Sequence, residues 1–172
     1  MGNRTLVPSI TPGQGGMTLL STTTLSGAST TISSISGTYN NLFAVIFGVT
    51  NATADGAFRI APNASTTIST SQTTSTSTAV TGSGNGYVLL SSASYLPLRT
   101  STTNVWKLEI YNYASTTGLK AYSVNGGFDN AGTNRGFFAT GFINTTSAIT
   151  SLVFDNAGGN LSTGTVLLYG VK

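Results

Sequence analysis

The sequence predicts an all-β fold, and three observations support this prediction. From residue 17 onward apolar side chains alternate with a period of two, and no segment keeps the i, i+3, i+4, i+7 spacing of an amphipathic helix over three turns. Short apolar runs rich in β-branched and aromatic residues recur, each bounded by Gly, Asn, Ser or Thr. These runs follow one another closely, which is typical of an antiparallel sandwich or barrel.

The chain begins with a segment that has little means of folding by itself. Residues 1–16 contain two prolines and several glycines, which disfavour a helix. Their apolar side chains are those of Leu6, Val7 and Ile10. We expect an extended N-terminal arm, which either remains a loose terminus or docks on a neighbouring subunit through these three side chains.

Residues 17–172 show one break in composition, and we expect them to form a single β-sandwich domain. The expected strands are Met17–Leu25, Thr30–Ile35, Asn41–Val49, Ala57–Ala61, Gly86–Ser91, Asn104–Tyr113, Leu119–Phe128, Gly136–Ile143, Ser151–Asp155 and Gly164–Val171. The break is the Ser/Thr-rich stretch 65–86, which has almost no apolar anchor. We expect it to be a long surface excursion, either irregular or folded as a hairpin.

The expected strand Asn104–Tyr113 has one apolar and one polar face. Trp106 and the apolar residues at alternate positions after it share one face, whereas Lys107 lies on the other. The same alternation places Tyr111 and Tyr113 on the polar face. A tyrosine there either contacts a surface ligand such as a sugar, or fills the core or a subunit interface.

Two other expected strands are apolar on both faces. They are Asn41–Val49 and Gly164–Val171. One face of each would line the core of a single sandwich, and the other needs a further partner to cover it. We therefore expect these strands to contribute to an interface between copies of this chain.

Composition excludes most catalytic chemistry. The chain has no His and no Cys, which excludes a Ser-His-Asp triad, a Cys nucleophile, a disulfide scaffold and the usual zinc sites. The chain contains 53 Ser and Thr residues and 14 Asn residues, whereas charged residues make up only 6% of it. Four of these charged residues are carboxylates. Each carboxylate has a structural explanation in a turn or an exposed strand. We therefore expect no enzyme activity and no cofactor.

A seven-residue pattern occurs twice, as Phe128–Asn134 and Phe154–Asn160, which share the sequence FDNAGxN. Asp, Asn and Gly favour turns, so two similar hairpin turns are expected. A calcium loop is the alternative, because oxygen ligands gather there. Each copy offers a single carboxylate and lacks the EF-hand spacing, so no metal site is predicted.

The distribution of charge and apolar residues also excludes two classes of partner. The seven cations are scattered singly along the chain, although nucleic-acid binding needs a dense basic patch. No apolar run approaches the roughly 20 residues of a membrane helix. We expect neither nucleic acid nor membrane as a partner.

Three stretches that together cover about half of the chain resemble small virion structural proteins of tailed bacteriophages, particularly those of aquatic or cyanobacterial hosts. They are Thr18–Asn63, Asn112–Thr117 (NYASTT) and Ile149–Lys172, which contains ITSLVFDNAGGNLSTGTVLLYGVK. Similar proteins are head-decoration or tail-fibre components. The resemblance implies a β-sandwich of jelly-roll type, usually a homotrimer, on the outer surface of the virion. It transfers no site residue.

The resemblance leaves two functions to compare. In the first, the protein is a capsid decoration (cement) protein that binds the major capsid protein and stabilises contacts between capsomers. In the second, it is the receptor-binding tip of a tail fibre and recognises a glycan of the host surface. A fibre needs a shaft of heptads or long repeats, and the chain has neither. The capsid function is therefore favoured.

Overall fold

The computed structural model describes residues 16–65, 70–75, 79–85, 87–91, 104–130 and 133–172, and these residues form twelve strands and no helix. The strands are β1 (Met17–Thr24), β2 (Ser29–Ile32), β3 (Asn41–Asn51), β4 (Phe58–Pro62), β5 (Thr70–Ser75), β6 (Ala79–Asn85), β7 (Val88–Leu89), β8 (Asn104–Tyr111), β9 (Lys120–Asn130), β10 (Thr133–Ile143), β11 (Leu152–Asn156) and β12 (Leu161–Val171).

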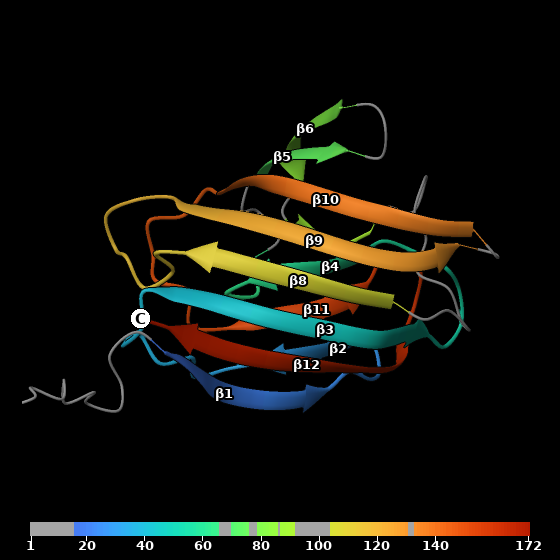
Figure 1. The fold of residues 1–172 in the computed structure, drawn as a ribbon, viewed down its shortest axis with the longest axis horizontal. Coiled ribbons are helices and arrows are strands. Elements are labelled where there is room, and N and C mark those ends of the chain that lie inside the picture. Colours follow the sequence, from blue (N-terminus) through green and yellow to red (C-terminus); the bar gives the residue numbers. More distant parts are fainter. Residues whose placement is uncertain (1–15, 66–69, 76–78, 86, 92–103, 131–132) are drawn as a thin grey trace, which may run out of the picture.

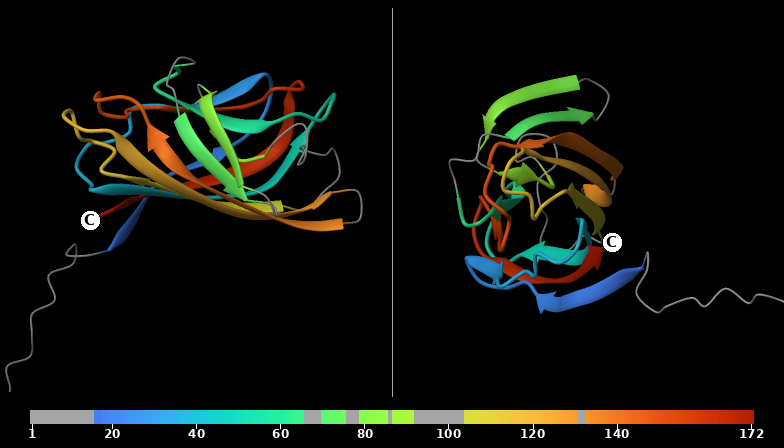
Figure 2. Two further views of the ribbon diagram at one scale, coloured as in Figure 1. Left: turned by 90° about the horizontal axis from the view of Figure 1, so that it is seen from above. Right: turned by 90° about the vertical axis from the view of Figure 1, so that its left-hand side faces the viewer.

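The strands form two antiparallel sheets that face each other (Figures 1 and 2). The large sheet has the order β1-β12-β3-β8-β9-β10-β5-β6, and the small sheet has the order β2-β11-β4-β7. Figure 1 looks onto the large sheet, with the small sheet behind it. From β1 to β4 the chain alternates between the sheets, and it alternates again from β10 to β12. Neighbouring strands such as β12 and β3 or β11 and β4 are therefore distant in sequence, whereas β8, β9 and β10 are neighbours in both sheet and sequence.

The core fills the space between the sheets. Its aromatic centre is Trp106, whose ring centroid lies 5.4 Å from that of Phe58 and 6.2 Å from that of Phe128. Phe58 in turn lies 6.3 Å from Phe154. These four side chains come from β8, β4, β9 and β11, so both sheets supply the aromatic centre.

The prediction of an all-β, antiparallel fold is confirmed for the described residues, and all ten expected strands are present within a few residues of their expected ends. In the stretch 65–86 the described strands β5 and β6 form a paired hairpin, which is one of the two expected forms. β5 also pairs with β10 and so extends the large sheet. The Ser/Thr-rich sequence of the stretch has no alternating apolar signal from which this pairing could be predicted.

The prediction of two similar hairpin turns is wrong for the second FDNAGxN segment. The first segment joins β9 to β10, which pair antiparallel from Asn130 and Thr133 onward. The second joins β11 of the small sheet to β12 of the large sheet. Gly158 and Gly56 permit this crossing, since a Cβ on Gly158 would lie 2.0 Å from the carbonyl oxygen of Asp55. Two loop backbones therefore touch where the chain changes sheet.

Candidate functional site

The side of the large sheet that faces away from the core carries a broad apolar surface. In β8 the core-facing Trp106 and Leu108 are each 1% exposed, whereas Val105 is 47% exposed and Tyr111 is 39% exposed. Side chains alternate in the same way along the neighbouring strands. We call this surface the outer apolar face, and it consists of Met17, Leu19, Phe43, Val45, Phe47, Val105, Tyr111, Phe138, Phe142, Leu167, Tyr169 and Val171.

Strand register makes the outer apolar face continuous. Tyr169 of β12 lies opposite Leu19 of β1 on one side and opposite Phe43 of β3 on the other. The rings of Phe43 and Tyr169 have their centroids 6.2 Å apart. Val45 pairs in the same way with Leu167. Apolar side chains thus contact one another across three strands, and such a continuous apolar surface is typical of a protein interface.

Sequence reasoning identified part of this face. The doubly apolar strands contain Phe43, Val45 and Phe47 of β3 and the outward residues of β12. It missed Phe138 and Phe142 of β10, which are 43% and 53% exposed. The signal was present in the segment GFFATGFI, where Phe137 and Ile143 face the core and two further phenylalanines occupy alternate positions facing outward.

Two charges lie within the outer apolar face. Lys107 is exposed and lies opposite Val45 and Asn125, while the half-buried Glu109 lies opposite Phe43. The Tyr111 hydroxyl donates a hydrogen bond to Glu109, and this bond raises the pKa of Tyr111. Among the described residues the one ion pair joins Arg59 to Asp155 of the small sheet, so Lys107 takes part in none.

The expected surface position of Tyr113 is wrong, whereas Tyr111 is exposed as expected. Tyr113 is 0% exposed, and its hydroxyl donates a hydrogen bond to the backbone oxygen of Ser36. β8 ends at Tyr111, and Asn112 then adopts a left-handed conformation with φ of 52°. This turn interrupts the alternation, so a residue expected to face outward is directed into the core. Burial raises the pKa of Tyr113.

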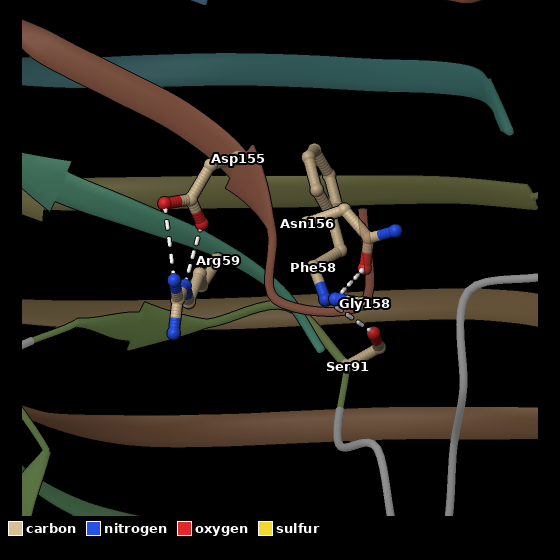
Figure 3. Close-up of polar contacts among 6 residues, drawn as sticks. All are labelled: Phe58, Arg59, Ser91, Asp155, Asn156 and Gly158. Atoms are coloured by element: carbon tan, nitrogen blue, oxygen red, sulfur yellow. Dashed lines mark hydrogen bonds and ion pairs between the residues drawn. The ribbon is translucent and has the colours of Figure 1, made fainter. Parts of the chain in front are cut away.

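The outward side of the small sheet carries a polar cluster (Figure 3). Arg59 of β4 donates two hydrogen bonds to Asp155 of β11, of 2.5 Å from Nε and 3.2 Å from its terminal nitrogen. The Arg59 guanidinium carbon also lies 3.9 Å from the ring centroid of Tyr87. Burial opposes the charge of Arg59, but the hydrogen bond and charge of Asp155 outweigh it and raise the pKa of Arg59.

The loops beside this cluster are held by their own hydrogen bonds (Figure 3). The side-chain oxygen of Asn156 accepts a hydrogen bond of 3.2 Å from Gly158 N–H, and that of Ser91 accepts one of 2.9 Å from Phe58 N–H. Asp155, the carboxylate of this FDNAGxN segment, is already bound by Arg59. Within the described ranges no three His, Cys, Asp or Glu residues gather as metal ligands would.

The remaining predicted contact residues, Leu6, Val7 and Ile10 of the arm, lie outside the described residues. No family model, curated protein or solved structure matches this chain. None of the described residues belongs to a helix long and apolar enough to span a membrane.

Proposed function

We propose that this protein is a virion structural protein of a tailed bacteriophage, which decorates the outer surface of the head, binds the major capsid protein and stabilises contacts between capsomers. The observation that carries the proposal is the outer apolar face, with its exposed Met17, Leu19, Phe138 and Phe142. A surface of this kind fits a protein whose work is to contact other proteins. The proposed role is structural and not catalytic.

We propose further that the two sheets form a jelly roll. Leaving aside the hairpin β5–β6 and the strands β9 and β10, the sheet orders are β1-β12-β3-β8 and β2-β11-β4-β7. Two four-stranded antiparallel sheets, joined by connections that cross between them, are the organisation of two interlocked Greek keys. Viral capsid domains and lectins use this architecture, so it supports a virion role without selecting the head over a fibre.

The composition also supports a place on the outside of a particle. The polar part of the chain consists mainly of neutral hydroxyl and amide groups, and charged residues make up 6%. Salt screens interactions between exposed charges, so a surface with few charges makes contacts that depend little on ionic strength. The chain also lacks Cys, so its fold does not depend on the redox state of its surroundings.

The copy number per virion tests this proposal. Quantitative mass spectrometry of purified particles should find this chain at a copy number comparable with that of the major capsid protein. Capsids prepared without the protein should also bind it when it is added back. A copy number matching one tail appendage, together with no binding to such capsids, would contradict the head assignment.

One observation favours the second function, glycan recognition at a fibre tip. Tyr87 offers an aromatic ring beside the paired polar groups of Arg59 and Asp155, and rings next to charged donors and acceptors suit sugar binding. A glycan array with the wild-type protein should then give signals that Tyr87→Ala abolishes. Tyr169→Ala, which alters an outward tyrosine of the opposite sheet, is the matched control.

A further inference from the structure

We propose that the outer apolar face packs against the same face of a second copy of this chain, about a two-fold axis that lies in the interface and runs perpendicular to β8. The proposal concerns the protein in solution and does not depend on its binding to a capsid. It follows from the size of the face, from the position of two charges within it, and from the register of the strands beside them.

The face is broad enough for a specific contact. Its residues lie on five of the six strands from β1 to β10, because the outward positions of β9 hold Ala121, Ser123 and Asn125. The face therefore spans about 24 Å across at a spacing of about 4.8 Å, and about 20 Å along the strands. Its projected area is therefore about 500 Å², and its accessible area is larger because side chains protrude. Specific interfaces bury about 600–1,000 Å² on each partner, and sheets readily pack face to face.

The two charges decide which occupant fits. Lys107 lies near the middle of the face, and covering it with an apolar partner would leave a buried charge without compensation. Glu109 follows two residues later on the same side of β8, about 7 Å away along the strand. A suitable partner must therefore present a carboxylate opposite Lys107 and a cation opposite Glu109. A second copy of β8 running in the opposite direction presents both.

The charges also select the axis. An in-plane two-fold axis that is perpendicular to β8 and passes at Leu108 places Lys107 of each copy opposite Glu109 of the other. An axis parallel to the strand would instead place lysine against lysine, and like charges in an interface are repulsive. The arrangement with the perpendicular axis forms two symmetric ion pairs, which flank the axis.

The same axis matches the apolar side chains. Phe43 lies beside Glu109 and Val45 lies beside Lys107, so Phe43 of one copy meets Val45 of the other. In β12, Tyr169 lies opposite Phe43 and Leu167 lies opposite Val45. Tyr169 of one copy therefore meets Leu167 of the other. Each larger aromatic ring thus faces a smaller aliphatic side chain, as close packing between two surfaces requires.

The proposal makes the assembly a dimer and not the trimer that the resemblance implies. A face that packs on itself contacts the same residues in both copies, and this requires a two-fold axis. A three-fold ring instead needs two different patches on each subunit. The mass of the assembly in solution therefore distinguishes the two arrangements.

Sedimentation equilibrium of the purified protein, without capsids, provides the test. The wild type should have the mass of a dimer at micromolar concentration. Lys107→Glu and Glu109→Lys should each weaken the dimer by about 10-fold or more, because each places like charges across the axis. The double variant K107E/E109K exchanges both charges and should restore the dimer to within a few-fold of wild type.

Controls separate this result from misfolding. Thr31→Glu adds a charge on the small sheet, away from the face and opposite Val153, and should leave the mass unchanged. Thermal melting should show that all variants fold. A monomeric or trimeric wild type, or a double variant as weak as the two single variants, would overturn the proposal. Capsid binding is measured separately. A monomer that binds capsids would overturn the dimer and leave the outer apolar face free for the capsid contact, whereas a dimer that binds capsids would place the capsid contact outside this face.

Discussion

At the residue scale, Lys120 is a cation held in the interior. It begins β9 and is 0% exposed, and its Nζ donates hydrogen bonds of 2.8 Å to the Gly118 carbonyl and 2.9 Å to the Thr145 carbonyl. It therefore joins the turn before β9 to the segment after β10. Burial lowers the pKa of Lys120 below its ordinary value of 10.5, because the charged form loses its hydration.

Lys120→Met should reduce the free energy of unfolding by about 1–3 kcal/mol, since two carbonyls lose their donor. The substitution should also change how the free energy of unfolding depends on pH. Between the lowered pKa of Lys120 and 10.5 the unfolded chain binds more protons than the folded chain, so the stability contributed by this group rises with pH. The neutral amine keeps two N–H donors for the two carbonyls. Urea unfolding at several pH values measures both effects.

The quantity to follow is the wild-type stability minus that of Lys120→Met, because other titrating groups cancel in this difference. It should increase as the pH approaches 10.5 from neutrality. A difference that stays flat or falls over this range would contradict the assignment. Lys172→Met, a change at an exposed lysine, is the control for replacing a lysine by methionine and should alter the free energy of unfolding by less than about 0.5 kcal/mol.

Asn104 provides a second residue-scale prediction. Its side-chain oxygen accepts a 2.9 Å hydrogen bond from Val49 N–H, and its amide donates one of 2.6 Å to the Val49 carbonyl. The side chain thus continues the ladder where β3 bends at Gly48, which has φ of 64°. Asn104→Ala leaves two buried backbone groups without partners and should cost about 2–4 kcal/mol in chemical denaturation. The exposed Asn144→Ala should change stability by less than about 0.5 kcal/mol.

At the element scale, β8 and β9 pack closely because one residue has no side chain. Gly126 of β9 lies opposite Trp106 of β8, and a Cβ added to it would lie 2.2 Å from Cδ1 of the indole ring. The ring is 1% exposed and is surrounded by other aromatic groups, so it has little room to move. The glycine therefore allows the largest core side chain to lie against the backbone of the neighbouring strand.

Gly126→Ala should destabilise the fold by about 1–3 kcal/mol, the usual cost of overpacking a core. Calorimetry should show a lower melting temperature for this variant. Gly136→Ala is the matched control in β10, because no atom lies within 4 Å of the position of its Cβ. It should be neutral or slightly stabilising, as a Gly to Ala change at a compatible position is. Equal effects of the two substitutions would show that packing against Trp106 is not the cause.

At the scale of the whole molecule, the core between the two sheets begins directly after β1 and draws on the strands that follow. Among the residues that the structure describes, the buried members of the core cluster lie between Leu25 and Leu168. Ordering an arm on a partner costs about 1–2 kcal/mol per residue in backbone entropy. Burying three aliphatic side chains returns about 1.5–3 kcal/mol each, so backbone hydrogen bonds across the contact must supply the rest.

A chain that begins at Met17 should accordingly keep its fold and its melting temperature but bind capsids more weakly. Binding to capsids that lack the protein, followed by a fixed wash, measures the loss. A full-length variant with Leu6, Val7 and Ile10 changed to Ser preserves the length of the arm and should show a similar defect. Full occupancy of the truncated protein after the same wash would show that a face of the sandwich makes the contact.

The sequence alone determined the all-β class, ten of the strands and which side of β8 faces the core. These features depend on local periodicity, because alternate side chains of a strand always lie on opposite faces. It also identified β3 and β12 as strands with two apolar faces. It did not show that Phe138 and Phe142 extend the same surface, since this depends on which strands are neighbours.

The tertiary structure decided the features that depend on contacts between distant segments. It assigned β11 and β12 to different sheets although one short turn joins them, because pairing partners are far apart in sequence. It placed Tyr113 in the core, since the left-handed Asn112 interrupts the alternation on which the prediction relied. It also buried Lys120 against the Thr145 carbonyl, 25 positions away in the sequence. Alternation specifies two faces for a strand, and only packing determines what covers each of them.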